Sequence, residues 1–312
     1  MKRFAGALAL LVAVGTASAG CGDSQTPTPA SARGRDPSLP YPKTGKTKDF
    51  AFTITENVPW EVGPGALYSG LAYNAQIPGP AIEVSAGDHI RIQLTNQAKA
   101  PHSIHTHVVL YTNDNDGVDG PSLVPPGETR TIEWDAVFAG TFPYHDHGAE
   151  GDGVARGLFG ALIVHAPDEL PANEQLVILA DFPKTNYATL PGVADPMTGN
   201  FPDAGMYRGG HEYMHTINGK AYEDAVPPFT AKVGDRVRWR VISIGSEDHT
   251  WHVHGHRWLD PSRSVLTDNV ELAPGTYTTF EWMEDNPGSW LVHCHFPDHM
   301  EGGMMARYVV AP

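Results

Sequence analysis

The sequence contains an internal duplication with an offset of about 147 residues. The run Gly87-Asp88-His89-Ile90-Arg91 recurs as Gly234-Asp235-Arg236-Val237-Arg238. The chain must therefore fold as two similar units, each of ordinary domain size. We expect the first unit over residues 48–166 and the second over residues 174–312. Residues 167–171, with a proline at each end, predict a turn-rich connector between the two units.

The composition predicts that each unit is a β-sandwich. Glycine (33) and proline (27) are abundant, only 18% of the residues are charged, and runs such as 90–94 alternate apolar and polar side chains. Short alternating strands bounded by turn residues are typical of all-β sandwiches. The formal net charge of −15 argues against nucleic acid as a partner.

Histidines occur four times as His-x-His pairs, two pairs in each unit and in register with the duplication. The pairs are His105/His107, His145/His147, His252/His254 and His293/His295. Residues two apart on a strand share a face, so each pair can present two imidazoles to a metal. In a chain with 16 histidines one such pair can arise by chance, but four pairs in register indicate metal binding.

The second unit also carries a ligand set of a different kind, which consists of His249, Cys294, His299 and Met304. Two histidines and a thiolate with a weak axial methionine form the blue-copper site of electron-transfer proteins. Neighbouring side chains on a strand point to opposite faces. Cys294 should therefore bind copper on one face, while the histidines on either side of it bind metal on the other.

The first unit lacks this blue-copper set. Asp146 stands in the register of Cys294, Gly151 in that of His299 and Arg156 near that of Met304. Of the four blue-copper ligands, only His249 has a histidine in the same register of the first unit, which is His102. Without a thiolate no blue site forms, so we expect His102 to have a structural or incidental role.

At these residues the chain resembles the two-domain, laccase-like multicopper oxidases, from about residue 50 onward. The resemblance implies two cupredoxin-like Greek-key β-sandwich domains with one type 1, one type 2 and two type 3 coppers per active unit. Type 1 copper takes electrons from a donor, and the other three reduce O2 to water. The implied ligands are His249, Cys294, His299 and Met304 for type 1, His105 and His252 for type 2, and His107, His145, His147, His254, His293 and His295 for type 3.

The resemblance also implies partners. Clusters in this family lie between the first domain of one chain and the second domain of the next, which predicts a homotrimer closed by cyclic symmetry. Phenols and aromatic amines are the expected reductants. Oxidation of Cu(I), Mn(II) or Fe(II) is the alternative, although the eight methionines form no methionine-rich run.

Two further residues match family positions near the cluster. Asp116 stands where similar enzymes place an acid that relays protons, and Tyr111 matches a tyrosine near the type 2 copper. Oxygen reduction consumes protons, so a carboxylate there has a defined task. The structural alternative is that Asp116 and Gly117 simply form a turn.

Three other interpretations are weaker. A copper nitrite reductase would carry its blue-copper cysteine in the first domain, where Asp146 stands. A non-catalytic copper carrier would leave the His-x-His pairs unexplained. The run 211–215 fits the zinc-protease motif H-E-x-x-H, but that chemistry needs a helix, and this run leads into Thr216-Ile217-Asn218-Gly219, which predicts strand and turn. His89, His165 and His256 are expected not to bind metal.

The first residues predict export. Residues 1–20 combine a charged start, an apolar stretch at 4–14 and a possible cleavage site at 17–19, as in a signal peptide. Cys21 ends a run that resembles a lipobox, so a lipid anchor to the membrane and plain secretion both remain open. Residues 21–47 predict a disordered tether. We expect a bacterial periplasmic, cell-envelope or extracellular protein.

Overall fold

The computed structural model describes residues 36–63, 65–148, 152–183, 187–189, 213–260 and 262–312. The predicted signal peptide, Cys21 and residues 22–35 of the predicted tether lie outside the described residues, as do Gly151 and the motif residues His211 and Glu212. No helix in the described ranges is long and apolar enough to cross a membrane.

The first half of the chain forms two facing sheets. One has the order β10-β2-β1-β4-β6 and the other β3-β8-β7-β5. The strands of the first half are β1 (Thr47–Gly63), β2 (Ala66–Tyr73), β3 (Ile82–Ser85), β4 (Asp88–Asn96), β5 (His105–Thr106), β6 (Thr129–Ala136), β7 (Gly140–His145) and β8 (Phe159–His165). The short strand β10 (Tyr187–Thr189) comes from the second half and pairs with β2 at the edge of the first sheet. The helices are η2 (Asn113–Asn115), η3 (Gly120–Ser122) and α1 (Asp152–Arg156).

The second half repeats this architecture with sheets β11-β9-β13-β18 and β12-β20-β19-β14-β17 and a small β15-β16 pair. Its elements are β9 (Asn173–Pro183), β11 (Tyr213–Ile217), β12 (Phe229–Lys232), β13 (Arg236–Ile244), β14 (His249–Val253), β15 (Trp258–Leu259), β16 (Leu266–Thr267), β17 (Asn269–Leu272), β18 (Tyr277–Met283), β19 (Gly288–His293), α2 (Pro297–Glu301) and β20 (Met305–Ala311).

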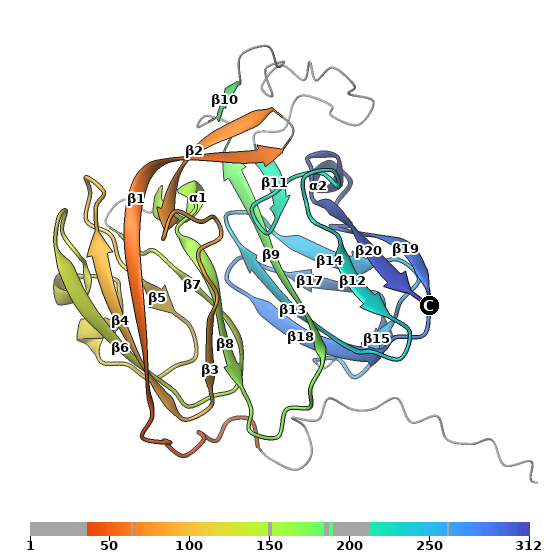
Figure 1. Cartoon of the computed structure of the whole chain (residues 1–312), viewed down its shortest axis with the longest axis horizontal. Coiled ribbons are helices and arrows are strands. Elements are labelled where there is room, and N and C mark those ends of the chain that lie inside the picture. Colours follow the sequence, from red (N-terminus) through yellow and green to blue (C-terminus); the bar gives the residue numbers. More distant parts are fainter. Residues whose placement is uncertain (1–35, 64, 149–151, 184–186, 190–212, 261) are drawn as a thin grey trace, which may run out of the picture.

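The central strand pairings of the two halves correspond, whereas among the described residues the pairs β10/β2, β14/β17 and β15/β16 each occur in one half only. The parallel pair β1/β4 matches β9/β13, and the parallel pair β3/β8 matches β12/β20. The antiparallel neighbours β7 and β5 match β19 and β14. Figure 1 shows the two sandwiches side by side, with β9 running along their boundary. The predicted all-β fold with two cupredoxin-like sandwiches is confirmed.

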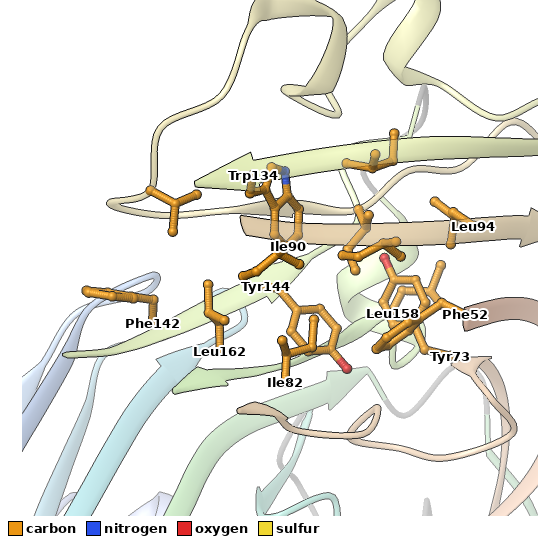
Figure 2. Close-up of a cluster of buried hydrophobic side chains, with 14 of the residues drawn as sticks. Phe52, Tyr73, Ile82, Ile90, Leu94, Trp134, Phe142, Tyr144, Leu158 and Leu162 are labelled. Carbon is orange, nitrogen blue, oxygen red and sulfur yellow. The ribbon is translucent and has the colours of Figure 1, made fainter. Parts of the chain in front are cut away.

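Each sandwich is filled by its own apolar core. In the first, strands alternate buried and more exposed positions. Every second residue of β4, from Asp88 to Asn96, is buried, because successive side chains of a strand point to opposite faces. Figure 2 shows Trp134 and Ile90 from one sheet above Tyr144 and Leu162 from the other. In the second sandwich the core includes Cys294 and Met304, both with no exposed surface.

The two sandwiches also share a buried junction. A third apolar cluster combines Tyr68 and Phe159 of the first with Ile178 and Phe182 of β9. Beside it Arg240, only 2% exposed, donates to Glu169 Oε1 at 2.7 Å, to Glu174 Oε2 at 2.7 Å and to Thr141 Oγ1 at 3.0 Å. A guanidinium so deeply buried needs these partners to offset its lost hydration.

The described end of the predicted tether packs against the first sandwich. Tyr41 N–H donates to Val137 O at 2.7 Å, and Thr44 N–H donates to Gly87 O at 2.8 Å. The Tyr41 ring packs on the first core. The proline-rich, polar composition of residues 36–46 predicted that they belong to a disordered tether. In the structure, backbone hydrogen bonds attach this stretch to the first sandwich.

Candidate metal centres

The predicted blue-copper residues converge at one end of the second sandwich. His249 begins β14, Cys294 follows β19, His299 lies on α2 and Met304 directly precedes β20. His249 Nδ1 lies 3.1 Å from His299 Nδ1, and Cys294 Sγ lies 3.6 Å from the same His299 atom. Met304 is fully buried, and its N–H donates to His299 O at 3.0 Å. Three donor atoms that face one point suit a single metal ion.

The electrostatics of this group favour a thiolate. Burial raises the pKa of Cys294, but hydrogen bonds from His249 and His299 outweigh burial and bring the pKa to about 6. Thr250 N–H also donates to the sulfur at 3.3 Å. The thiolate is the form of cysteine that binds metal.

Behind the two histidines lie acidic residues. Asp181, a buried carboxylate on β9, places Oδ1 3.4 Å from His249 Nε2. On the other side Glu247 Oε2 lies 3.6 Å from His299 Nε2. It also accepts a hydrogen bond from His215 Nε2 at 2.6 Å. Such outer partners orient ligand histidines.

His215 stacks directly on His299, with ring centroids 4.1 Å apart and planes inclined by 12°. Donor atoms of His215, Glu247 and His299 all lie within 4.8 Å of one another. His215 lies on β11, which agrees with the strand expected there, and a strand cannot give the helical arrangement of the protease motif.

The four first-half histidines form a tetrad at the ends of β5 and β7. His105 pairs with His145 across these strands, and His107 Nε2 lies 3.4 Å from His145 Nε2. The His147 ring lies 4.8 Å from that of His105 and 4.7 Å from that of His145.

The second-half tetrad repeats this arrangement on β14 and β19. His252 pairs with His293 across the strands, and His254 Nε2 lies 3.0 Å from His293 Nε2. The His295 ring lies 5.2 Å from that of His252. Cys294 and its two neighbours therefore lie in different groups of candidate ligands, although β19 itself ends at His293.

Backbone carbonyls fix the tautomers of the paired histidines. Nδ1–H of His105 donates to Asp116 O at 2.6 Å, and Nδ1–H of His252 donates to Asp268 O at 2.8 Å. His293 donates in the same way to Cys294 O at 2.8 Å. With Nδ1 protonated, each ring keeps its Nε2 lone pair for a metal.

Burial keeps the deepest of these imidazoles neutral. It lowers the pKa of His145 to about 3 and that of His293 to about 4, and neighbouring histidines add to the effect. A neutral ring is the form that binds metal. The two tetrads fit a transition-metal ion with imidazole ligands.

The two tetrads remain separate within one chain. Among the described residues, no candidate metal group combines histidines of both halves. His147, His254 and His295 are exposed, so each tetrad presents ligands to solvent.

Asp116 and Tyr111 both lie beside His105. Asp116 Oδ1 is 3.3 Å from His105 Nδ1, and the Tyr111 ring lies 5.9 Å from the His105 ring. Burial raises the pKa of Tyr111, and the Asp116 carboxylate raises it further. Asp116 also ends the η2 turn, with Gly117 at φ +84°. The turn and the contact with His105 therefore coexist.

Multicopper oxidase sequence profiles match residues 55–169 and residues 189–312. The chain belongs to the multicopper oxidase family. Membership implies copper as the metal, and the imidazole and thiolate donors described above fit copper.

Relatives of this multicopper oxidase have mixed names. The probable nitrite reductase-hydroxylamine oxidoreductase fusion protein of Kuenenia stuttgartiensis is 33% identical over 279 residues, which cover 80% of this chain and 30% of that protein. Ferroxidase HEPHL1 of Homo sapiens is 28% identical over 288 residues, which cover 76% of this chain and 24% of that protein. The chain thus spans less than a third of these curated relatives. The blue copper oxidase of Nitrosomonas europaea is 28% identical with a TM-score of 0.70, and the match covers 85% of this chain and 86% of that one.

The sequence alone did not identify the outer partners of the group formed by His249, Cys294 and His299. Asp181 could have been noticed as a lone acid in the apolar strand run 176–182. His215 was considered only as part of a protease motif. Glu247 lies two residues before His249 in a polar loop and carries no pattern that distinguishes it.

Proposed function

We propose that this multicopper oxidase takes single electrons from a donor at a type 1 site and reduces O2 to water at a trinuclear site. The type 1 ligands are His249, Cys294, His299 and Met304, and the eight paired histidines hold the trinuclear site. One observation carries the proposal. Cys294 faces one ligand group while both of its covalent neighbours face the other.

Copper, when bound as one type 1, one type 2 and two type 3 ions, supplies the redox chemistry. The chain supplies the path between the sites. Cys294 is covalently continuous with His293, and the His293 ring also donates to the Cys294 carbonyl at 2.8 Å. Asp116 holds a carboxylate oxygen 3.3 Å from His105, where it can deliver protons that oxygen reduction consumes.

The trinuclear site requires a second copy of the chain. Each tetrad has exposed imidazoles, and the two tetrads of one chain form no common ligand group among the described residues. We propose that the first-half tetrad of one copy meets the second-half tetrad of the next in a homotrimer. Exposed Val108 (46%) and Leu110 (48%), which follow His107, support a contact surface there.

Phenols and aromatic amines are the first candidate donors. Electron transfer to a blue-copper histidine needs proximity rather than a shaped covalent site, so many small aromatic reductants qualify. The family resemblance supports this candidate.

A metal ion is the second candidate, and a specific observation favours it. Both type 1 histidines are largely buried, with His249 at 0% and His299 at 7% exposure. The His215 ring stacks on one face of the His299 ring, and the Glu247 carboxylate lies 3.6 Å from His299 Nε2. Such imidazole and carboxylate donors are suited to Fe(II) or Mn(II) beside His299, whereas Cu(I) prefers sulfur ligands.

Export, with or without a lipid anchor at Cys21, is part of the proposal. The apolar run before Cys21 supports it.

Oxygen uptake by the copper-loaded protein tests the proposal. We expect uptake that ends in water with a methoxyphenol, with Fe(II) or with both, and the rates decide between the candidate donors. Cys294→Ser should abolish uptake with every donor. No uptake with any donor, or uptake that survives in Cys294→Ser, would contradict the proposal.

A further inference from the structure

A buried carboxylate separates two trinuclear-site histidines of the first half. Asp146 lies between His145 and His147 and is 4% exposed. Its Oδ2 accepts a hydrogen bond from His102 Nδ1–H at 2.9 Å, and its Oδ1 accepts one from Ser103 N–H at 2.7 Å. Burying a carboxylate is unfavourable unless its oxygens are hydrogen-bonded. Both oxygens of Asp146 are bonded.

The same connections surround Cys294 in the second half. Thr250, in the register of Ser103, donates its N–H to Cys294 Sγ at 3.3 Å. Thr250 Oγ1 accepts from His295 N–H at 2.6 Å, and Ser103 Oγ accepts from His147 N–H at 3.0 Å. The backbone frame of the type 1 site is therefore retained in the first half, where Asp146 takes the place of the thiolate.

The space around Asp146 is fitted to the carboxylate. A Cβ atom at Gly153 would lie 2.0 Å from Asp146 Oδ2, and one at Gly148 would lie 2.9 Å from the same oxygen. Both positions therefore exclude side chains at their present backbone geometry. The carboxylate therefore fills the space between these glycines.

We propose that the His102–Asp146 hydrogen bond replaces, in the first half, the cross-link that type 1 copper makes in the second. Both residues are positioning residues. His102 lies three residues before His105, and Asp146 lies between His145 and His147. A single bond therefore ties the β5 end of the tetrad to the β7 end. The first-half tetrad is held ready for copper without a blue site of its own.

This inference rests on the proposed trinuclear site, because it concerns the geometry of that site's ligands. Loss of a partner that orients metal-binding residues typically lowers metal affinity about 10–100-fold. We expect a loss of that size at the trinuclear site in His102→Ala and in Asp146→Ala. The type 1 site, in the other sandwich, should remain unchanged.

The experiment measures copper binding by the full-length protein, with a chelator competing for the metal. Blue absorption per chain reports the type 1 site, and paramagnetic resonance of the type 2 copper reports the trinuclear site. Circular dichroism and sedimentation check that each variant folds and assembles. His102→Asn should restore affinity, because its amide nitrogen takes the position of Nδ1 and can still donate to Asp146.

His89→Ala is the matched control. His89 Nδ1 also lies 2.9 Å from a carboxylate, Asp135 Oδ1, in the same sandwich but on β4. Supporting results are trinuclear copper lost in His102→Ala, kept in His89→Ala and regained in His102→Asn, with blue absorption constant throughout. A double variant of His102 and Asp146 should lose no more than either single variant.

Two results would overturn the inference. One is unchanged trinuclear affinity in folded His102→Ala and Asp146→Ala, and the other is an equal loss in His89→Ala. Failure of the wild-type protein itself to bind trinuclear copper would instead overturn the proposed function. The two failures are therefore distinguishable.

Discussion

Glu284→Gln should destabilise the folded protein by about 2 kcal/mol at neutral pH and by about half of that at pH 3. The carboxylate is 2% exposed and accepts hydrogen bonds from Tyr308 Oη at 2.5 Å, His256 Nε2 at 2.9 Å and Trp282 Nε1 at 2.9 Å. Burial raises its pKa, but these bonds outweigh burial and lower the pKa to about 2.

The magnitude follows from the linkage between pKa and stability. A carboxyl with a pKa of about 4.3 in the unfolded chain and about 2 in the fold contributes about 3 kcal/mol at neutral pH. Glutamine keeps one acceptor oxygen, so the substitution should cost about 2 kcal/mol of this contribution. Because the folded pKa of Glu284 is depressed, the contribution is fully present above the unfolded pKa. It is lost as the pH falls from about 5 to about 2.

Urea unfolding of the copper-free protein at pH 7, 5 and 3 measures this effect. The difference in unfolding free energy between the wild-type protein and Glu284→Gln should shrink by about 1 kcal/mol from pH 7 to pH 3. Other carboxyl groups titrate in both proteins and cancel in the difference. Glu271→Gln, an exposed carboxylate on β17, is the control.

A difference that stays constant from pH 7 to pH 3 would refute the reasoning. Glutamine would then act only through its shape, and the ionised carboxylate would contribute nothing specific. A pH-dependent difference of the same size in Glu271→Gln would also refute it.

Three other substitutions test separate parts of the molecule. Arg240→Met leaves Glu174 paired with Arg238, and Glu169 paired with Arg238 and His165. It should cost about 3 kcal/mol in urea unfolding, and no loss would show that the junction is not stabilised by the Arg240 pairs. Asp116→Asn should slow oxygen uptake about 100-fold at neutral pH, whereas unchanged turnover and pH profile would leave the residue as a turn former. Leu110→Asp should give monomers by light scattering, with blue absorption kept and trinuclear copper lost, and an intact trimer would exclude this surface from the interface.

Both tetrads could be predicted because their information is local. Residues two apart share a strand face whatever the rest of the fold does, so His252 and His254 had to point the same way. The opposite orientation of Cys294 followed from the same rule. The duplication then placed each pair in an equivalent sandwich, which fixed the fold as well as the ligands.

The surroundings of the ligands depend on contacts that no local pattern encodes. Asp181 on β9 meets His249 on β14 only because these strands lie in sheets that face each other. His252 donates a hydrogen bond to the backbone carbonyl of Asp268. Any residue at that position could supply this carbonyl, so the sequence does not mark it. The hydrogen bond between His102 and Asp146 joins residues that are 44 positions apart in the sequence, so no local pattern indicates it.

His215→Phe separates the two candidate donors. In the wild-type protein the His215 ring stacks on His299 with centroids 4.1 Å apart, and its Nε2 donates to Glu247 at 2.6 Å. A phenyl ring can keep the stack but has no nitrogen to donate to Glu247. If a metal ion is the donor, KM for Fe(II) should rise about tenfold or more, because a ligand is removed. Turnover of a methoxyphenol should be unchanged, since outer-sphere transfer needs no such ligand.

Phe296→Leu is the matched control for this edge of the type 1 site. The Phe296 ring lies 5.1 Å from the His299 ring but offers no metal ligand. If both variants leave Fe(II) kinetics unchanged, the metal-ion candidate fails, because a donor bound at His215 would respond to its loss. If His215→Phe slows both donors equally, the residue acts through His299 itself. A loss confined to Fe(II) and to His215→Phe would identify the His215–Glu247 pair as the place where the electron donor binds.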